Sequence, residues 1–130
     1  MPPTGATGVL KITATAQANP ISMGKTTSVL IFVTNERAQA DRDVALSVQA
    51  LDDGLSLGLT GTSPTPVVAS SPAAIDFAPI RELPPGQQLP NPFRIEVRGL
   101  KAGPHRIRVI ATSALGGVGA STETEIVVNP

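Results

Sequence analysis

Apolar residues in this chain recur at every second position, in several segments that are separated by turns. The pattern is cleanest in residues 44–50, 93–98 and 105–111, where aliphatic or aromatic side chains alternate with polar or small ones. A period of two places successive side chains on opposite faces of a β-strand. Each segment therefore predicts a strand with one face in a core and the other in solvent. The predicted inward residues are Val44, Leu46, Val48, Ala50, Phe93, Ile95, Val97, Ile107, Val109 and Ala111.

Other segments extend this pattern along the chain. Residues 9–16 alternate loosely, and residues 26–35 are almost continuously apolar, which predicts a central strand buried on both faces. Residues 73–80 predict a short strand with Ile75 and Phe77 inward, and residues 122–130 predict a last strand. No window shows the apolar stripe of an amphipathic helix. The sequence therefore predicts an all-β protein, an antiparallel immunoglobulin-like β-sandwich of about seven or eight strands.

The length of 130 residues fits one domain. We expect residues 1–8 to be a flexible N-terminal segment and residues 9–130 to form the single sandwich domain. Residues 54–73, rich in Gly, Ser, Thr and Pro, predict irregular chain with one or two short edge strands. Residues 113–121 predict a flexible loop tip. An edge in 54–73 and this tip are the places where we expect a partner to bind.

Composition excludes several classes of function. Ten basic residues balance ten acidic ones, and only three residues are aromatic, which is unfavourable for binding nucleic acid. The absence of cysteine excludes disulfides and thiolate metal sites. No segment has the length and hydrophobicity of a membrane span, and the first residues, MPPTGATG, show no signal peptide. We therefore expect no nucleic acid partner and no membrane span.

Two glycine-containing motifs resemble nucleotide-binding loops. Gly24-Lys25-Thr26 matches the end of a phosphate loop, but Asn19 stands where the first glycine is needed, and a β-branched run follows instead of a helix. Residues 115–122, LGGVGAST, lack the third glycine of a dinucleotide fingerprint and precede a predicted strand. We interpret the first motif as a tight turn before a strand and the second as a hairpin loop. No cofactor is expected.

Catalytic and metal-binding candidates are few. His105 is the only histidine, and it follows Gly103-Pro104 at the start of a predicted strand, which indicates a structural or exposed residue. An enzyme would need a deep pocket with two carboxylates, or a carboxylate beside His105, so we predict that the chain is not an enzyme. Calcium prefers several oxygen ligands, but no Asp-x-Asp-x-Asp-Gly loop is present. The weak calcium candidates, with solvated turn carboxylates as the default interpretation, are Asp41, Asp43, Asp52 and Asp53.

Four arginines alternate with core residues on two successive predicted strands. They form either a basic stripe for an anionic partner or glycan, or a solvated face that is partly neutralised by Glu96. If the two strands belong to opposite sheets, the four side chains do not form one patch. These candidate partner-contact residues are Arg94, Arg98, Arg106 and Arg108.

Most of the chain resembles the immunoglobulin-like modules of bacterial surface proteins, the DUF11, CARDB and NEW3 groups. The resemblance rests on a Pro and a Gly before a strand that ends in Asn, a Leu-Pro-Gly type of turn, and a Gly-x-Tyr that opens a later strand. The matching residues are Pro20, Gly24, Thr34-Asn35, Leu83-Pro84-Pro85-Gly86 and Gly103-Pro104-His105. His105 thus stands where such modules often have the tyrosine of a tyrosine corner, and an imidazole can still make a hydrogen bond there.

The resemblance implies a non-catalytic structural or interaction module of a bacterial cell-surface or secreted protein, used for spacing, adhesion or contact with protein or carbohydrate. Neighbouring domains of a longer chain are the other expected partners. The location implied is extracellular. The alternative is a virion decoration or assembly protein with the same type of fold, which the absent signal sequence favours.

Overall fold

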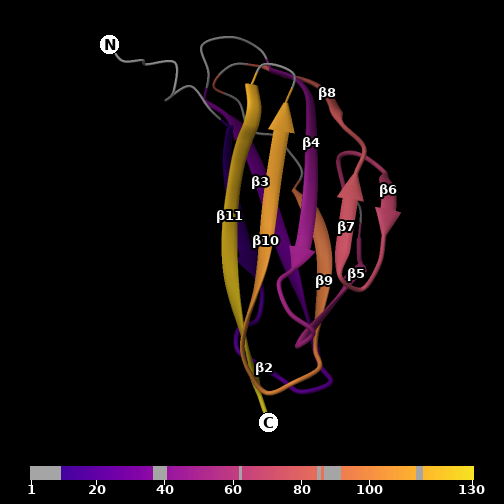
Figure 1. Cartoon of the computed structure of the whole chain (residues 1–130), viewed down its shortest axis with the longest axis vertical. Coiled ribbons are helices and arrows are strands. Elements are labelled where there is room, and N and C mark those ends of the chain that lie inside the picture. Colours follow the sequence, from indigo (N-terminus) through magenta and orange to yellow (C-terminus); the bar gives the residue numbers. More distant parts are fainter. Residues whose placement is uncertain (1–9, 37–40, 62, 85, 87–91, 114–115) are drawn as a thin grey trace.

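A computed structural model of the chain describes residues 10–36, 41–61, 63–84, 86, 92–113 and 116–130. These residues form two packed β-sheets (Figure 1). The predicted flexible segment 1–8 lies outside the described residues. The described part of the chain contains strands and turns, and it has no helix with the length and hydrophobicity needed to cross a membrane.

The first sheet has four strands in the order β1-β3-β9-β5, all antiparallel. Their bounds are Leu10–Ala16, Thr26–Asn35, Phe93–Gly99 and Leu55–Leu59. The second sheet has the order β2-β11-β10-β4-β7-β6, and β8 pairs with the start of β4. Their bounds are Ile21–Ser22 (β2), Gly116–Asn129 (β11), Gly103–Ser113 (β10), Asp41–Ala50 (β4), Ala74–Phe77 (β7), Val67–Ser70 (β6) and Ile80–Leu83 (β8). Among the strands of the described residues, only β2 and β11 pair in parallel.

The predicted all-β immunoglobulin-like sandwich is confirmed, but the predicted number of strands is too low. The described residues form eleven strands. Strands β2, β6 and β8 account for much of the difference. They have only two to four residues each, and so short a segment cannot show an alternating pattern.

The inward residues of both sheets form one core. Val48, Ile95 and Val109 are each fully buried, and the rings of Phe77 and Phe93 meet across the sheets at 4.8 Å with an interplanar angle of 62°. Edge-to-face packing of this kind adds to the gain from burying apolar area. The alternating segments thus face inward as predicted.

Strand β3 is central in its sheet, but it is not buried on both faces. Its residues alternate between buried and half-buried, with Leu30 and Phe32 on the half-buried outer face. The prediction of burial on both faces is wrong because the sandwich has two layers, so each sheet covers the core with one face only. The apolar run of β3 exceeds what the core requires.

The two sides of the sandwich differ. On one side, β1 lies against β11, whereas on the other the edges are β5 and β6, in opposite sheets. The prediction of short edge strands within residues 54–73 is confirmed.

The predicted loop tip 113–121 is mostly wrong, because β11 begins at Gly116 and pairs from there with β10. Backbone hydrogen bonds form this part of the ladder, and glycines offer no side-chain pattern that predicts them.

Candidate functional site

The Gly24-Lys25-Thr26 motif is a tight turn, as predicted. The Lys25 amide donates to the Ser22 carbonyl at 3.0 Å, and Gly24 has a positive φ of 83°. The Gly24 amide donates to the Gly99 carbonyl at 2.8 Å, and β3 begins at Thr26. The backbone donor that a phosphate would need is therefore already used within the protein.

The four candidate calcium ligands lie at two separate places. Asp41 and Asp43 are at the start of β4, and Asp52 and Asp53 follow its end. A strand of ten residues spans about 30 Å at 3.3 Å per residue, so the two pairs cannot share one ion. Among the described residues, no three His, Asp or Glu side chains are grouped to hold a metal.

The four arginines also fall into two pairs, because β9 and β10 belong to opposite sheets. As expected for strands in opposite sheets, the four arginine side chains do not form one patch. Arg108 pairs with Glu123 at 2.9 Å, and Arg106 lies 3.5 Å from the same carboxylate. The hydrogen bond from Arg108 lowers the pKa of Glu123. Arg94 and Arg98 pair with no carboxylate of the described residues.

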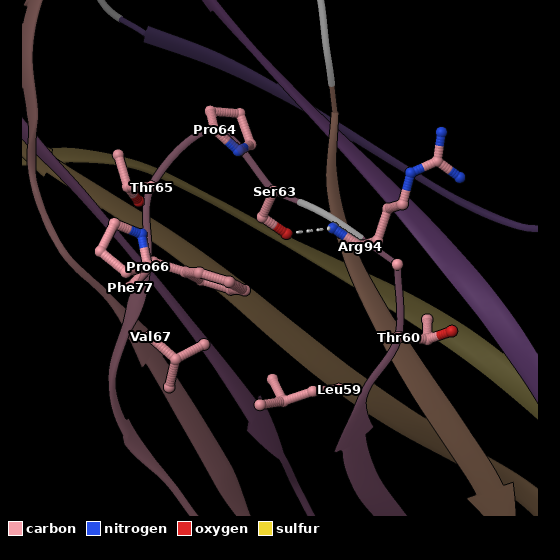
Figure 2. Close-up of a pocket in the computed structure, with 10 residues that line it drawn as sticks. Leu59, Thr60, Ser63, Pro64, Thr65, Pro66, Val67, Phe77 and Arg94 are labelled. Carbon is pink, nitrogen blue, oxygen red and sulfur yellow. Dashed lines mark hydrogen bonds between the residues drawn. The ribbon is translucent and has the colours of Figure 1, made fainter.

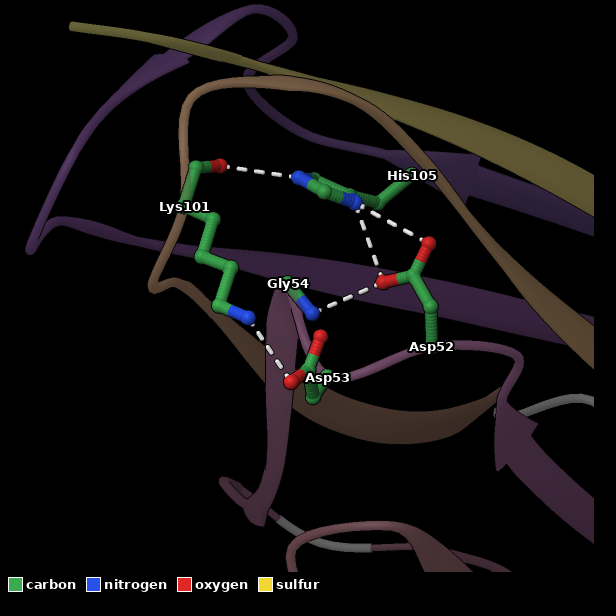
Figure 3. A network of polar contacts seen from close by, with 5 residues as sticks. All are labelled: Asp52, Asp53, Gly54, Lys101 and His105. Atoms are coloured by element: carbon green, nitrogen blue, oxygen red, sulfur yellow. Dashed lines mark hydrogen bonds and ion pairs between the residues drawn. The ribbon is translucent and has the colours of Figure 1, made fainter.

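A connected polar group surrounds His105, which lies near the start of β10 beside the turn that follows β4 (Figure 3). The His105 side chain is 12% exposed, and its Nδ1 lies 3.0 Å from the Asp52 carboxylate. Its Nε2 lies 2.8 Å from the Lys101 carbonyl oxygen. The Gly54 amide donates to the same Asp52 carboxylate at 2.7 Å. We call Asp52, Gly54, Lys101 and His105 the turn clamp.

The charge state of the turn clamp follows from its geometry. Both ring nitrogens of His105 face acceptors, and only the imidazolium can donate to both. The hydrogen bond to Asp52 raises the pKa of His105, and the same bond lowers the pKa of Asp52. The bond to the Lys101 carbonyl corresponds to the backbone bond of a tyrosine corner. His105 thus makes a backbone hydrogen bond of the kind that the sequence analysis allowed for an imidazole in this place.

Gly54 lies directly beneath the imidazole, and a Cβ at this position would collide with the ring. The Gly54 carbonyl accepts from the Leu100 amide at 2.8 Å and from the Lys101 amide at 3.3 Å. The clamp therefore ties the turn between β4 and β5 to the turn between β9 and β10. Both turns carry the chain from one sheet to the other, so the clamp holds the two sheets together at this end.

A carboxylate beside His105 is the feature that an enzyme would need, and the structure has one. Both ring nitrogens, however, are engaged with acceptors of the protein, so neither is available to take a proton from a substrate. A depression of about 330 Å³ next to the clamp is lined by Asp52 and Asp53 but not by His105. The geometry is that of a structural cluster.

A second depression lies on the open side, between β5 and β6 (Figure 2). Its volume is about 360 Å³. We call it the edge groove, and its lining residues are Leu59, Thr60, Gly61, Ser63, Pro64, Thr65, Pro66, Val67, Phe77 and Arg94. The sequence analysis placed a binding edge in this segment but did not find the groove. The available signal was the spacing Leu55-x-Leu57-x-Leu59, which continues the inward positions up to the groove.

No protein-family model and no curated protein sequence matches the chain. Solved structures do match. The CARDB domain of the PF1109 protein from Pyrococcus furiosus, in complex with di-metal ions, has 10% identity and a TM-score of 0.59, over 92% of this chain and 86% of that one. A cohesin module of a family 33 glycoside hydrolase from Clostridium perfringens has 8% identity and a TM-score of 0.54, over 95% and 98%.

A third match is AvmM, which catalyses macrocyclisation in alchivemycin A biosynthesis. It has 11% identity and a TM-score of 0.59, over 95% of this chain and 90% of that one. The predicted likeness to CARDB-type modules is thus confirmed as a likeness of fold. The same fold thus occurs in a CARDB domain, in a cohesin module and in a protein that catalyses macrocyclisation, so function has to be argued from this chain's own residues.

Proposed function

We propose that the chain is a non-catalytic immunoglobulin-like module of a cell-surface or secreted protein, carried in series with other domains as a spacer. The observation that carries this proposal is the placement of the start of β1 and the end of β11, the first and last described strands. Met23 donates its amide to the Asn129 carbonyl at 2.8 Å, so β2 and the end of β11 lie together. Strand β3 starts near this place and ends at Asn35, which pairs with Leu10.

The ten residues of β3 separate these two places by about 30 Å. The chain therefore enters the first described strand at one end of the sandwich and leaves the last strand at the other (Figure 1). This arrangement suits a module that extends a longer chain, since each unit adds its full length. His105 and Asp52 also tie together the turn between β4 and β5 and the turn between β9 and β10, which makes this end of the module rigid.

Labelling of source cells tests the surface location. An antibody raised against the purified chain is applied to intact cells and to permeabilised cells, with an antibody against a cytoplasmic protein as control. We expect label on intact cells or in the medium, where the control antibody gives none. Label that appears only after permeabilisation would refute the surface role.

A further inference from the structure

On the open side of the sandwich, the edge strand β5 has backbone groups at its end that pair with no neighbouring strand of the described residues. β5 pairs with β9 on one side, and on its other side the Leu57 amide donates to the Pro72 carbonyl at 2.9 Å. Backbone groups of alternate residues in a strand point to the same side. The backbone of Leu59 therefore points to this free edge as well. Among the described residues, none forms a backbone hydrogen bond with Leu59 on this side, so the end of β5 can accept another strand.

The side chain of Leu59 is only partly covered by the core. It follows Leu55 and Leu57 in the inward register, and these are 3% and 7% exposed, whereas Leu59 is 53% exposed. Figure 2 shows Leu59, Val67 and Phe77 around the same space. An apolar side chain placed in the edge groove would cover Leu59 and add to the apolar contacts at this end of the core.

Polar groups of the edge groove indicate what else a ligand would carry. The Thr65 hydroxyl oxygen is buried and has no hydrogen-bond partner among the described residues. Buried polar atoms in proteins are nearly always paired. Because this oxygen is shielded from solvent, a ligand N–H or C=O can pair with it once the Thr65 side chain turns towards the groove. Ser63 is already used, because its hydroxyl accepts from the Arg94 amide at 3.0 Å.

The charge of the groove's lining also indicates which chemical groups a ligand would carry. Arg94 is the one charged residue among those that line the groove, and it pairs with no carboxylate of the described residues. A carboxylate on the ligand would complement it. Together these features describe an extended peptide with an apolar side chain at the position that enters the groove and an acidic side chain within reach of Arg94.

We propose that the edge groove and the free edge of β5 bind an extended, acidic and apolar segment of a partner protein by strand addition. The partner segment pairs its backbone with the end of β5, places an apolar side chain against Leu59, Val67 and Phe77, and directs a carboxylate to Arg94. This activity goes beyond the spacing role and does not depend on it.

The test begins with a displayed library of random peptides, selected on the wild-type chain. We expect the selected peptides to share an apolar residue and a nearby Asp or Glu. Binding of a synthetic peptide should shift the backbone amide resonances of Leu59, Thr65 and Val67 in NMR spectra. The substitutions Leu59→Lys and Arg94→Glu should each weaken binding at least tenfold.

Two controls separate binding from folding. Leu51 is another exposed leucine, at 41%, away from the edge groove, so Leu51→Lys should leave affinity unchanged. Replacing the peptide's acidic residue by Lys should restore binding to the Arg94→Glu variant. The proposal is overturned if no peptide is enriched, if selected peptides bind Leu59→Lys as tightly as wild type, or if the shifted resonances lie on another face.

Discussion

Replacing Gly54 by Ala tests the turn clamp, because a Cβ at this position would occupy the space of the His105 ring. Forcing extra atoms into a packed site costs about 1–3 kcal/mol. If the ring moves away instead, its two hydrogen bonds are lost, at about 0.5–1.5 kcal/mol each. Either route gives the same range, so we expect Gly54→Ala to lower the free energy of unfolding by about 1–3 kcal/mol, as measured by urea denaturation.

Gly58→Ala is the matched control, since a Cβ there would meet its nearest neighbour, Glu96, at an ordinary 3.9 Å. Its effect should stay within about 0.5 kcal/mol, as for other unstrained surface changes. In a His105→Ala background the collision is absent, so Gly54→Ala should become at least about 1 kcal/mol less costly, a coupling typical of residues in contact. Equal effects of the two glycine substitutions, or additivity with His105→Ala, would refute the assigned packing.

Three further predictions concern single side chains. Because the pKa of His105 is raised and that of Asp52 is lowered, the clamp should stabilise fully between the ordinary values of 3.8 and 6.5. The difference in unfolding free energy between wild type and Asp52→Asn should thus be about 1 kcal/mol in this window. The difference should shrink as the pH rises through the folded pKa of His105, and also as it falls through the folded pKa of Asp52. A difference independent of pH would contradict the pairing. Asp43 has a positive φ of 53°, so Asp43→Gly should change thermal stability little, whereas Asp43→Val should cost about 1–2 kcal/mol, and equal effects would disprove backbone strain. Asn35 is fully buried and donates to the Leu83 carbonyl at 2.8 Å, so Asn35→Ala should cost about 1–3 kcal/mol in chemical denaturation, and a cost near zero would show that the bond is dispensable.

The strands that pack the core were predictable because burial on one face imposes a period of two. Residues 44–50 and 93–98 have the predicted inward side chains, and the edge strands within 54–73 followed from their Gly and Pro content. A hairpin was predicted at residues 115–122, but the start of β11 as early as Gly116 was not predictable, because its pairing with β10 depends on the backbone and on a neighbouring long strand. Strand β2 is too short to carry any pattern.

The candidate site was less accessible to sequence reasoning. Asp52 and His105 are 53 positions apart, and they meet only because two crossover turns lie at the same end of the sandwich. The sequence indicated each turn by itself, through Asp-Asp-Gly and Gly-Pro-His, but nothing in it sets the distance between them. Likewise, the exposure of Leu59 depends on where the opposite sheet ends, which no local pattern specifies.

Mechanical unfolding of single molecules tests the in-series role most directly. The chain has no cysteine, so engineered cysteine pairs give unique attachment points. Pulling at the two chain ends draws β1 and β11 in opposite directions along their lengths and loads many strand hydrogen bonds at once. Pulling between Lys25→Cys and Pro130→Cys, which lie at the same end of the sandwich, opens the contacts one after another. We predict a clearly higher unfolding force for the end-to-end geometry; an equal or lower force would contradict a module built to carry tension along its length.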